Sequence, residues 1–202
     1  MKSFYKFARI LVYPIFKWLL PVRFVGFDET EKKGGYIMCA NHTSMTDPFF
    51  MGVAFKRQIH FMAKIELFRI PIIKSIAKAG GAFSVDRGAG DVGAIEHADN
   101  IIKRGHIVGI FPEGTRYKTG APRKAKSGIA YIAMHTKADI LPVSIYREGG
   151  FNLFRKTTVR CGEVIPFGEL YDETLTDRAN LKNIVNRVTD ELTALWEMGH
   201  EN

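Results

Sequence analysis

Short apolar runs alternate along this chain with segments of helical periodicity, and this alternation is the feature that most narrows its fold. The pattern is typical of β-α units arranged around a largely parallel sheet. It starts near residue 34 and continues through most of the 202 residues. Five apolar runs are predicted to be strands: Tyr36–Ala40, Ile59–Met62, Ala82–Val85, Ile107–Phe111 and Ile140–Ile145.

Helices are predicted between and after these strands. Their ranges are 48–56, 65–79, 90–103 and 127–136, and Thr158–Phe167 is predicted to be a late strand. A well-patterned C-terminal helix follows, with Thr176 or Asp177 as its N-cap. The length suits one domain. We therefore expect a single α/β domain with a largely parallel central sheet flanked by helices.

The charge balance of the chain favours an anionic partner. It has 29 Lys and Arg against 21 Asp and Glu, a formal net charge of +8. Nucleic acid, a phospholipid surface and phosphorylated small molecules all fit such a balance. The two cysteines, Cys39 and Cys161, form no disulfide framework and no C-x-x-C pair, so we expect both to be packing residues.

Residues 1–27 contain five cations and eight aromatic side chains and no acid. On a helix, Phe4, Phe7, Leu11, Ile15 and Trp18 share one stripe, and Lys2, Lys6, Arg9 and Lys17 lie on the opposite arc. This pattern is typical of a helix that lies in a membrane interface. Pro14 is expected to kink or divide it. No apolar run reaches the roughly 18 residues that a spanning helix needs.

Three other interpretations of this segment stay open: a signal peptide, a core helix, and a helix that binds a protein partner. Lys17 interrupts the apolar stretch and no A-x-A site follows, which disfavours a signal peptide. Aromatic side chains combined with cations on one side favour the membrane interface. We therefore divide the chain into a membrane-interface segment, residues 1–27, and an α/β domain, residues 28–202.

The first predicted strand runs directly into a polar segment, Asn41–Pro48. The carboxylate of Asp47 can hold one ring nitrogen of His42, which leaves the other nitrogen to take a proton. The structural alternative is that Asp47 caps the following helix, with Pro48 at its first position. No G-x-S-x-G is present, and Ser44 lies too close to His42 in sequence for a hydrolase nucleophile. If His42 is a base, it activates a substrate hydroxyl.

A second polar segment, Phe111–Arg116, follows a later strand, and several cations up to Lys126 come after it. Amides freed by glycine, a hydroxyl, a guanidinium and a helix N-terminus are the parts of phosphate sites. Glu113 suits such a site if the ligand also carries hydroxyls. The alternative is a solvated basic loop in which Glu113 pairs with Arg116.

A third segment, Gly80–Arg87, contains another predicted strand and ends in an arginine. This arginine is expected at the same side of the sheet as the other two polar segments. Arg87 is either a second anion contact or the partner of Asp86 or Asp91 in a surface ion pair. The histidines show no metal-ligand spacing, so no metal site is predicted.

Taken together and in this order, these segments resemble the glycerolipid acyltransferase family of lysophosphatidate (1-acylglycerol-3-phosphate) O-acyltransferases. The match covers roughly residues 35–145. It rests on four blocks: N-H-x-x-x-x-D at Asn41–Asp47, glycine-aromatic-arginine at Gly81–Arg87, F-P-E-G-T-R at Phe111–Arg116, and an apolar block with proline at Ile140–Ser144. The chain departs from the family at Tyr117, where a serine is frequent, and at Ala125, where an aromatic is frequent.

The resemblance implies a role for each site residue. His42 is the general base and Asp47 orients it. Arg87 and Arg116 contact phosphate, and the remaining substrate-binding residues are Glu113, Gly114, Thr115 and Lys126. The implied reaction moves a fatty acyl group from an acyl-CoA or acyl-carrier-protein thioester to the free sn-2 hydroxyl of lysophosphatidate, giving phosphatidate in phospholipid synthesis. Such a transfer requires no cofactor and no metal.

The expected partners are the acyl-CoA or acyl-carrier protein, a lysophospholipid acceptor and an anionic membrane surface, with no nucleic acid. We expect a membrane-associated protein, monotopic or peripheral, on the cytoplasmic face of the inner or plasma membrane. Two alternatives remain: acylation of another acceptor, such as glycerol 3-phosphate or another lysolipid, and a non-catalytic membrane lipid-binding protein.

Overall fold

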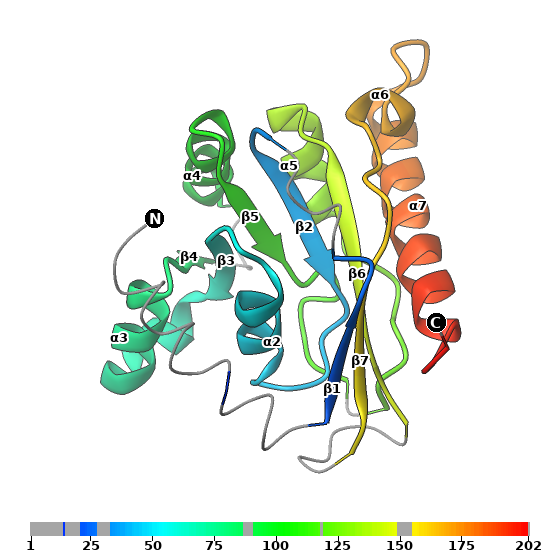
Figure 1. Cartoon of the computed structure of the whole chain (residues 1–202). Coiled ribbons are helices and arrows are strands. Elements are labelled where there is room, and N and C mark those ends of the chain that lie inside the picture. Colours follow the sequence, from blue (N-terminus) through cyan, green and yellow to red (C-terminus); the bar gives the residue numbers. More distant parts are fainter. Residues whose placement is uncertain are drawn as a thin grey trace.

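A seven-stranded sheet forms the centre of the computed structural model, which describes Pro14 and residues 21–27, 33–86, 91–117, 119–148 and 155–201. The strand order is β1-β7-β6-β2-β5-β3-β4 (Figure 1). The strands are β1 (Val22–Val25), β2 (Tyr36–Ala40), β3 (Ile59–Lys64), β4 (Phe83–Val85), β5 (Ile107–Ile110), β6 (Ile140–Arg147) and β7 (Thr157–Cys161).

The five strands from β6 to β4 run parallel, which confirms the largely parallel sheet. At the other edge β7 is antiparallel to β6, and β1 runs parallel to β7. The centre of the sheet is β2, where Ile37 pairs with Val108 of β5 and with Ile140 of β6. Every residue of β2 is buried, as expected for a parallel strand covered on both faces.

Helices cover both faces of the sheet (Figure 1). They are α2 (Asp47–Ala54), the 3₁₀ turn η1 (Ile65–Arg69), α3 (Pro71–Ala79), α4 (Val92–Lys103), α5 (Gly128–Thr136), α6 (Phe167–Leu170) and α7 (Asp177–Glu197). Ile37 and Cys39 of β2 belong to the core shared with α4, α5 and α7. Tyr36 and Met38 belong to the core shared with α2. The alternation of strand side chains thus supplies two separate cores.

The predicted strands of the parallel region and the C-terminal helix are confirmed. Thr176 is the N-cap of α7, and its Oγ1 accepts a hydrogen bond from the amide of Ala179 at 3.3 Å. Two predictions were wrong in part. The helix expected over 65–79 is divided at Ile70, because Pro71 lacks an N–H and starts a new helix. The late strand stops at Cys161, and α6 begins at Phe167 after Pro166.

The sequence pattern missed β1. Val22–Val25 were assigned to the membrane-interface segment, yet they pair with β7 in the sheet. The residues of the expected amphipathic helix lie outside the described part of the chain, apart from Pro14. Within the described residues, no helix combines the length and the apolar character that crossing a bilayer requires.

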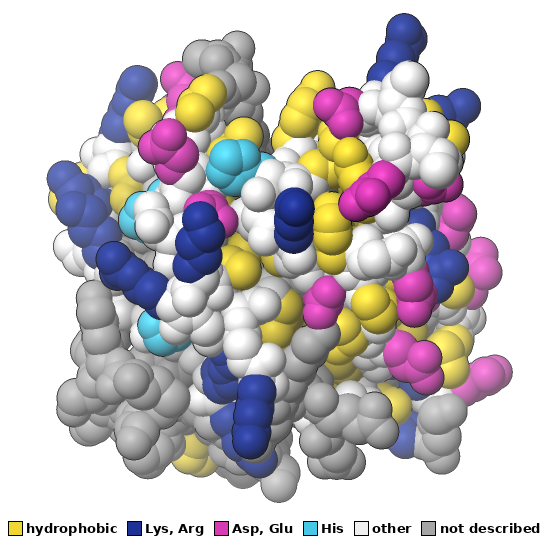
Figure 2. Space-filling view, turned by 90° about the horizontal axis from the view of Figure 1, so that it is seen from above, with side chains coloured by type: hydrophobic (Ala, Val, Ile, Leu, Met, Phe, Trp, Pro, Cys, Tyr) yellow, Lys and Arg dark blue, Asp and Glu magenta, His cyan; other side chains and the backbone are white. Residues whose placement is uncertain are grey.

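The amino ends and the carboxyl ends of the parallel strands lie at opposite sides of the domain. Both acidic and basic side chains occupy the face seen in Figure 2, which looks onto the amino ends of the parallel strands. The carboxyl ends lead into the segments Asn41–Thr46 and Phe111–Tyr117. In sheets of this type, ligands bind beyond the carboxyl ends of the strands.

Candidate active site

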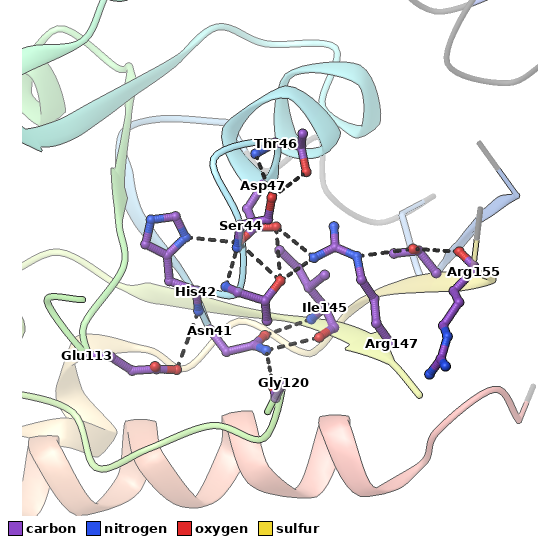
Figure 3. Close-up of polar contacts among 12 residues, drawn as sticks. Asn41, His42, Ser44, Thr46, Asp47, Glu113, Gly120, Ile145, Arg147 and Arg155 are labelled. Atoms are coloured by element: carbon purple, nitrogen blue, oxygen red, sulfur yellow. Dashed lines mark hydrogen bonds and ion pairs between the residues drawn. The ribbon is translucent and has the colours of Figure 1, made fainter. Parts of the chain in front are cut away.

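The segment Asn41–Thr46 leaves the carboxyl end of β2 and enters α2 (Figure 3). The buried side chain of Asn41 holds the start of this segment against β6. Asn41 Nδ2 donates to the carbonyl oxygens of Ile145 at 2.9 Å and Gly120 at 3.1 Å, and Oδ1 accepts the Ile145 amide at 2.7 Å. These bonds fix the point from which His42 projects.

His42 and Asp47 form the pair that the sequence predicted. The distance from His42 Nδ1 to Asp47 Oδ2 is 2.9 Å. An ionised carboxylate only accepts hydrogen bonds, so Nδ1 carries the proton of this contact and Nε2 is the ring nitrogen left to exchange a proton with a ligand. The His42 side chain is 17% exposed, whereas Asp47 is completely buried. The arrangement is that of a histidine base oriented by a carboxylate.

The surroundings of Asp47 hold it in the ionised form. The amides of Thr43 and Ser44 each donate to Oδ2 at 2.7 Å, and Arg147 Nη1 lies 3.0 Å from Oδ1. Burial acts to raise the pKa of Asp47, but the hydrogen bond from His42, the charge of Arg147 and the Ser44 amide together hold this pKa below its ordinary value. Asp47 is therefore a carboxylate at neutral pH.

The alternative role of Asp47 as a helix cap does not hold. The N-cap of α2 is Thr46, and Asp47 is the first helical residue with Pro48 beside it. The Asp47 carboxylate instead accepts hydrogen bonds from the segment that precedes α2. The Asp47 carboxylate therefore serves the pair with His42 and not the end of α2.

The segment after β5 packs directly against His42. The Phe111 ring stacks on the His42 ring with centroids 4.0 Å apart and an interplanar angle of 17°. The amide of Tyr117 donates to the carbonyl oxygen of His42 at 2.9 Å. The structure therefore brings together the first and second polar segments of the sequence.

Gly114 lies at a turn that requires glycine. Its φ is +72°, and a Cβ at this position would lie 3.2 Å from Cδ and Nζ of Lys126. The main chain of Lys126 also joins this turn, because its amide donates to the Pro112 carbonyl at 2.9 Å. Lys126 and Gly114, two of the predicted substrate-binding residues, are thus neighbours.

Glu113 is buried beneath this turn and is 2% exposed. Its Oε1 accepts the His42 amide at 3.4 Å, and Oε2 has no hydrogen-bond partner within the described residues. Burial raises the pKa of Glu113 to about 7, against the opposing effect of hydrogen bonds from the Arg123 and His42 amides. Glu113 is buried and contacts the main chain that carries His42, so the alternative of a solvated basic loop in which Glu113 pairs with Arg116 does not hold.

Two further predicted substrate-binding residues lie at the surface. Thr115 and Arg116 are exposed and follow Gly114 directly. Arg87 lies outside the described residues, so its role stays a prediction. Cys39 and Cys161 are both buried, which confirms that they are packing residues. Among the residues that the structure describes, no three His, Cys, Asp or Glu side chains are grouped to hold a metal ion.

Sequence reasoning missed Arg147. It ends β6 with 1% exposure and forms an ion pair with Asp47. A signal was present, because a charged residue that terminates an otherwise apolar buried strand needs a partner. The fourth sequence block stops at Ser144, three residues short of it.

These features define an α/β protein with a histidine held by a buried carboxylate beyond the carboxyl ends of its parallel strands. The model of the Acyltransferase family matches residues 21–146, which include both site segments and all but the last residue of β6. The chain belongs to this family, and the resemblance seen in the four sequence blocks is confirmed.

Curated relatives match over part of their length. The chain is 32% identical over 142 residues to the 1-acyl-sn-glycerol-3-phosphate acyltransferase of Borreliella burgdorferi, covering 66% of this chain and 55% of the relative. It is 37% identical over 124 residues to the Bacillus subtilis protein of the same name, covering 60% of this chain and 61% of the relative. The chain therefore aligns with little more than half of each relative.

A solved structure shares the fold. The 1-acyl-sn-glycerophosphate (LPA) acyltransferase PlsC from Thermotoga maritima superimposes with a TM-score of 0.63 at 24% identity. The superposition covers 96% of this chain and 85% of that protein. This likeness supports the single mostly parallel α/β domain.

Proposed function

We propose that this protein transfers a fatty acyl group from a thioester donor to the free sn-2 hydroxyl of lysophosphatidate, forming phosphatidate. The observation that carries the proposal is the 2.9 Å contact between His42 and a buried, ionised Asp47. Two curated relatives are named 1-acyl-sn-glycerol-3-phosphate acyltransferases, which supports this acceptor.

The geometry suggests a direct transfer. His42 Nε2 takes the hydroxyl proton while the oxygen attacks the thioester carbonyl carbon, and Asp47 stabilises the resulting imidazolium. A carbon–oxygen bond forms and the carbon–sulfur bond breaks. The proton on His42 then passes to the departing thiolate sulfur, which regenerates the neutral base.

We assign acceptor binding to the turn after β5. Arg116 and Lys126 supply positive charge for the acceptor phosphate, and the Gly114 turn lets the main chain approach it. Glu113 Oε2 lies buried next to the His42 main chain and would accept a hydrogen bond from an acceptor hydroxyl. Arg87 completes the set of phosphate contacts in this assignment.

We also propose that the protein binds the anionic cytoplasmic surface of a membrane, and α3 supports this. None of its nine residues is buried, and Ile72 and Ile76, one turn apart, are 75% and 53% exposed. Lys74 and Lys78 lie on the same helix, beyond the β4 edge of the sheet (Figure 1). Exposed apolar side chains beside cations are typical of helices in a membrane interface.

Vesicle binding tests the membrane proposal. The double variant Ile72→Gln/Ile76→Gln should sediment less with anionic vesicles, because it removes the exposed apolar pair. Converting Lys2, Lys6, Arg9 and Lys17 to Gln should weaken binding to anionic vesicles by about 1 kcal/mol per cation near the surface, and binding to neutral vesicles less. Unchanged sedimentation of both variants, with normal melting, would exclude these contacts.

Turnover tests the reaction. The purified chain is offered acyl-CoA or acyl-carrier protein with lysophosphatidate, glycerol 3-phosphate or other lysolipids, and thiol release and lipid products are measured. Phosphatidate formed with release of one thiol per acyl group supports the proposal. Products from another acceptor alone would redirect the assignment. Lipid binding without thiol release from any mixture would favour a non-catalytic lipid-binding protein.

A further inference from the structure

Arg147 makes contacts with three separate parts of the fold (Figure 3). Its Nη1 donates to Asp47 Oδ1 at 3.0 Å and to Thr43 Oγ1, and its Nε donates to Thr157 Oγ1 of β7 at 3.2 Å. The guanidinium carbon lies 4.9 Å from the centroid of the Phe50 ring on α2. One side chain at the end of β6 therefore links the β2–α2 segment, α2 and β7.

Stability alone does not account for an arginine at this place. Removing a guanidinium from water is costly, and a buried ion pair is often no more stabilising than apolar side chains of the same volume. Desolvation indeed lowers the pKa of Arg147, against the opposing effect of Asp47. A role in the chemistry of Asp47 explains why a charge is buried here.

The two oxygens of Asp47 have different partners. Oδ2 faces His42 Nδ1 and the amides of Thr43 and Ser44, whereas Oδ1 faces Arg147. A carboxylate held at both oxygens cannot rotate away from the imidazole. Its hydrogen bond to Nδ1–H also fixes the tautomer in which Nε2 is the base.

We propose that Arg147 is a positioning residue: it holds the Asp47 carboxylate toward His42 and partly compensates its charge, so that His42 Nε2 is oriented and unprotonated when the acceptor hydroxyl arrives. The role in turnover rests on the proposed acyl transfer, whereas the effect on the His42–Asp47 pair is independent of it.

The charged groups around the pair define what removing Arg147 does. His42 and Asp47 come from the segment before and at the start of α2, and Glu113 comes from the segment after β5, with Arg123 acting on Glu113. The neighbours of Arg147 on α2 and β7 are the neutral Phe50 and Thr157. Without the guanidinium, the Asp47 charge acts uncompensated on His42, and Nε2 keeps its proton to higher pH.

The test compares Arg147→Met, which removes the charge, with Arg147→Lys, which keeps it, in the full chain. We expect Arg147→Met to lower kcat at pH 7 by about 10- to 100-fold, the size of loss known for groups that orient a metal-bound histidine, with the acceptor KM little changed. The acidic limb of the kcat–pH profile of Arg147→Met should move to higher pH by about one unit. Arg147→Lys should keep the wild-type limb and recover part of kcat.

Two controls separate this role from a structural one. Thr157→Val removes the hydrogen bond of Nε without changing any charge, so its acidic limb should stay in place. Glu113→Gln removes the carboxyl group whose pKa burial raises to about 7, so a limb that persists in this background does not report Glu113. Circular dichroism and melting report whether each variant is folded.

Nitrogen NMR of the His42 ring, assigned by its loss in His42→Ala, follows the protonation of the base without turnover. If the His42 ring loses its proton at higher pH in Arg147→Met than in wild type, the positioning role is supported even when no acyl transfer is found. The positioning role and the proposed function can therefore fail independently of each other. If Arg147→Met does not fold, the test rests on Arg147→Lys. Because this variant keeps the charge, its ring tautomer and titration should match those of wild type, and a mismatch would overturn the proposal. A kcat lowered equally at every pH, with unchanged ring signals, would show that Arg147 is only structural.

Discussion

The segment after β2 and the segment after β5 meet at His42 but are held in different ways. In the first, Asn41 and Asp47 are buried and hydrogen-bonded to β6 and to their own segment. In the second, Thr115 and Arg116 are exposed, and Glu113 keeps one oxygen without a partner in the described part of the chain. The first segment has its partners within the protein, whereas the second leaves polar groups for a ligand.

The difference fits the two tasks that we propose for these segments. A general base must have its tautomer, orientation and charge fixed before the substrate arrives, because reorganising them would add to the barrier. A phosphate-binding turn works by exchanging water for the ligand, so its cations stay accessible. Substitutions in the first segment should therefore reduce turnover, and substitutions in the second should change substrate binding.

His42→Ala should give the largest effect. It removes the base, and we expect kcat to fall by about 10²- to 10⁴-fold while folding and vesicle binding persist. Steady-state thiol release and a thermal melt measure the two properties. Near-normal turnover of a folded variant would refute the assignment.

Asp47→Asn comes next and affects both activity and stability. We expect kcat to fall by no more than in His42→Ala, because the imidazolium loses its carboxylate, and the free energy of unfolding to fall by about 3–5 kcal/mol from breaking the buried pair with Arg147. The folded pKa of Asp47 is lowered, so its stabilising contribution is present above the unfolded value of about 3.9 and is lost as pH falls through the folded value. Urea unfolding between acidic and neutral pH should show this dependence in wild type and not in Asp47→Asn.

Arg116→Ala should act on binding and leave the base intact. Losing a charge-assisted contact should raise the lysophosphatidate KM by about 10-fold with a small change in kcat, and Arg87→Ala should behave similarly. The KM of the thioester donor serves as the internal control. If both variants instead raise only the donor KM, the arginines bind the phosphates of the donor.

Glu113→Gln should give the smallest change in turnover, measured at acidic pH. It should also change how the free energy of unfolding depends on pH. The folded pKa of Glu113 is raised to about 7, so its stabilising contribution is complete below the unfolded value of about 4.3 and is lost as pH rises through 7. Wild type should lose up to about 3 kcal/mol of unfolding free energy across this window, and Glu113→Gln should lose much less. Equal slopes for both proteins would show that Glu113 is already ionised below neutrality.

Local sequence signals predicted most of the parallel region and the His42–Asp47 pair. Apolar runs marked β2, β5 and β6, and the five-residue spacing placed both site residues on one short segment. β1 was missed because its four residues were grouped with the aromatic and cationic residues of the segment 1–27. Arg147 was missed because its partner Asp47 lies 100 residues away: the local pattern indicates that the charge needs a partner, but not which residue supplies it.

That separation also has a consequence for the order in which the chain is made and folded. The segment that carries His42 is complete early in synthesis, but Asn41 and Asp47 reach their partners only after β6 has been added. Contacts so distant in sequence form late, because the intervening chain must first be ordered. A fragment that ends before β6 therefore lacks the contacts that hold Asn41 and Asp47, and the geometry of the His42–Asp47 pair is complete only when the sheet is nearly finished.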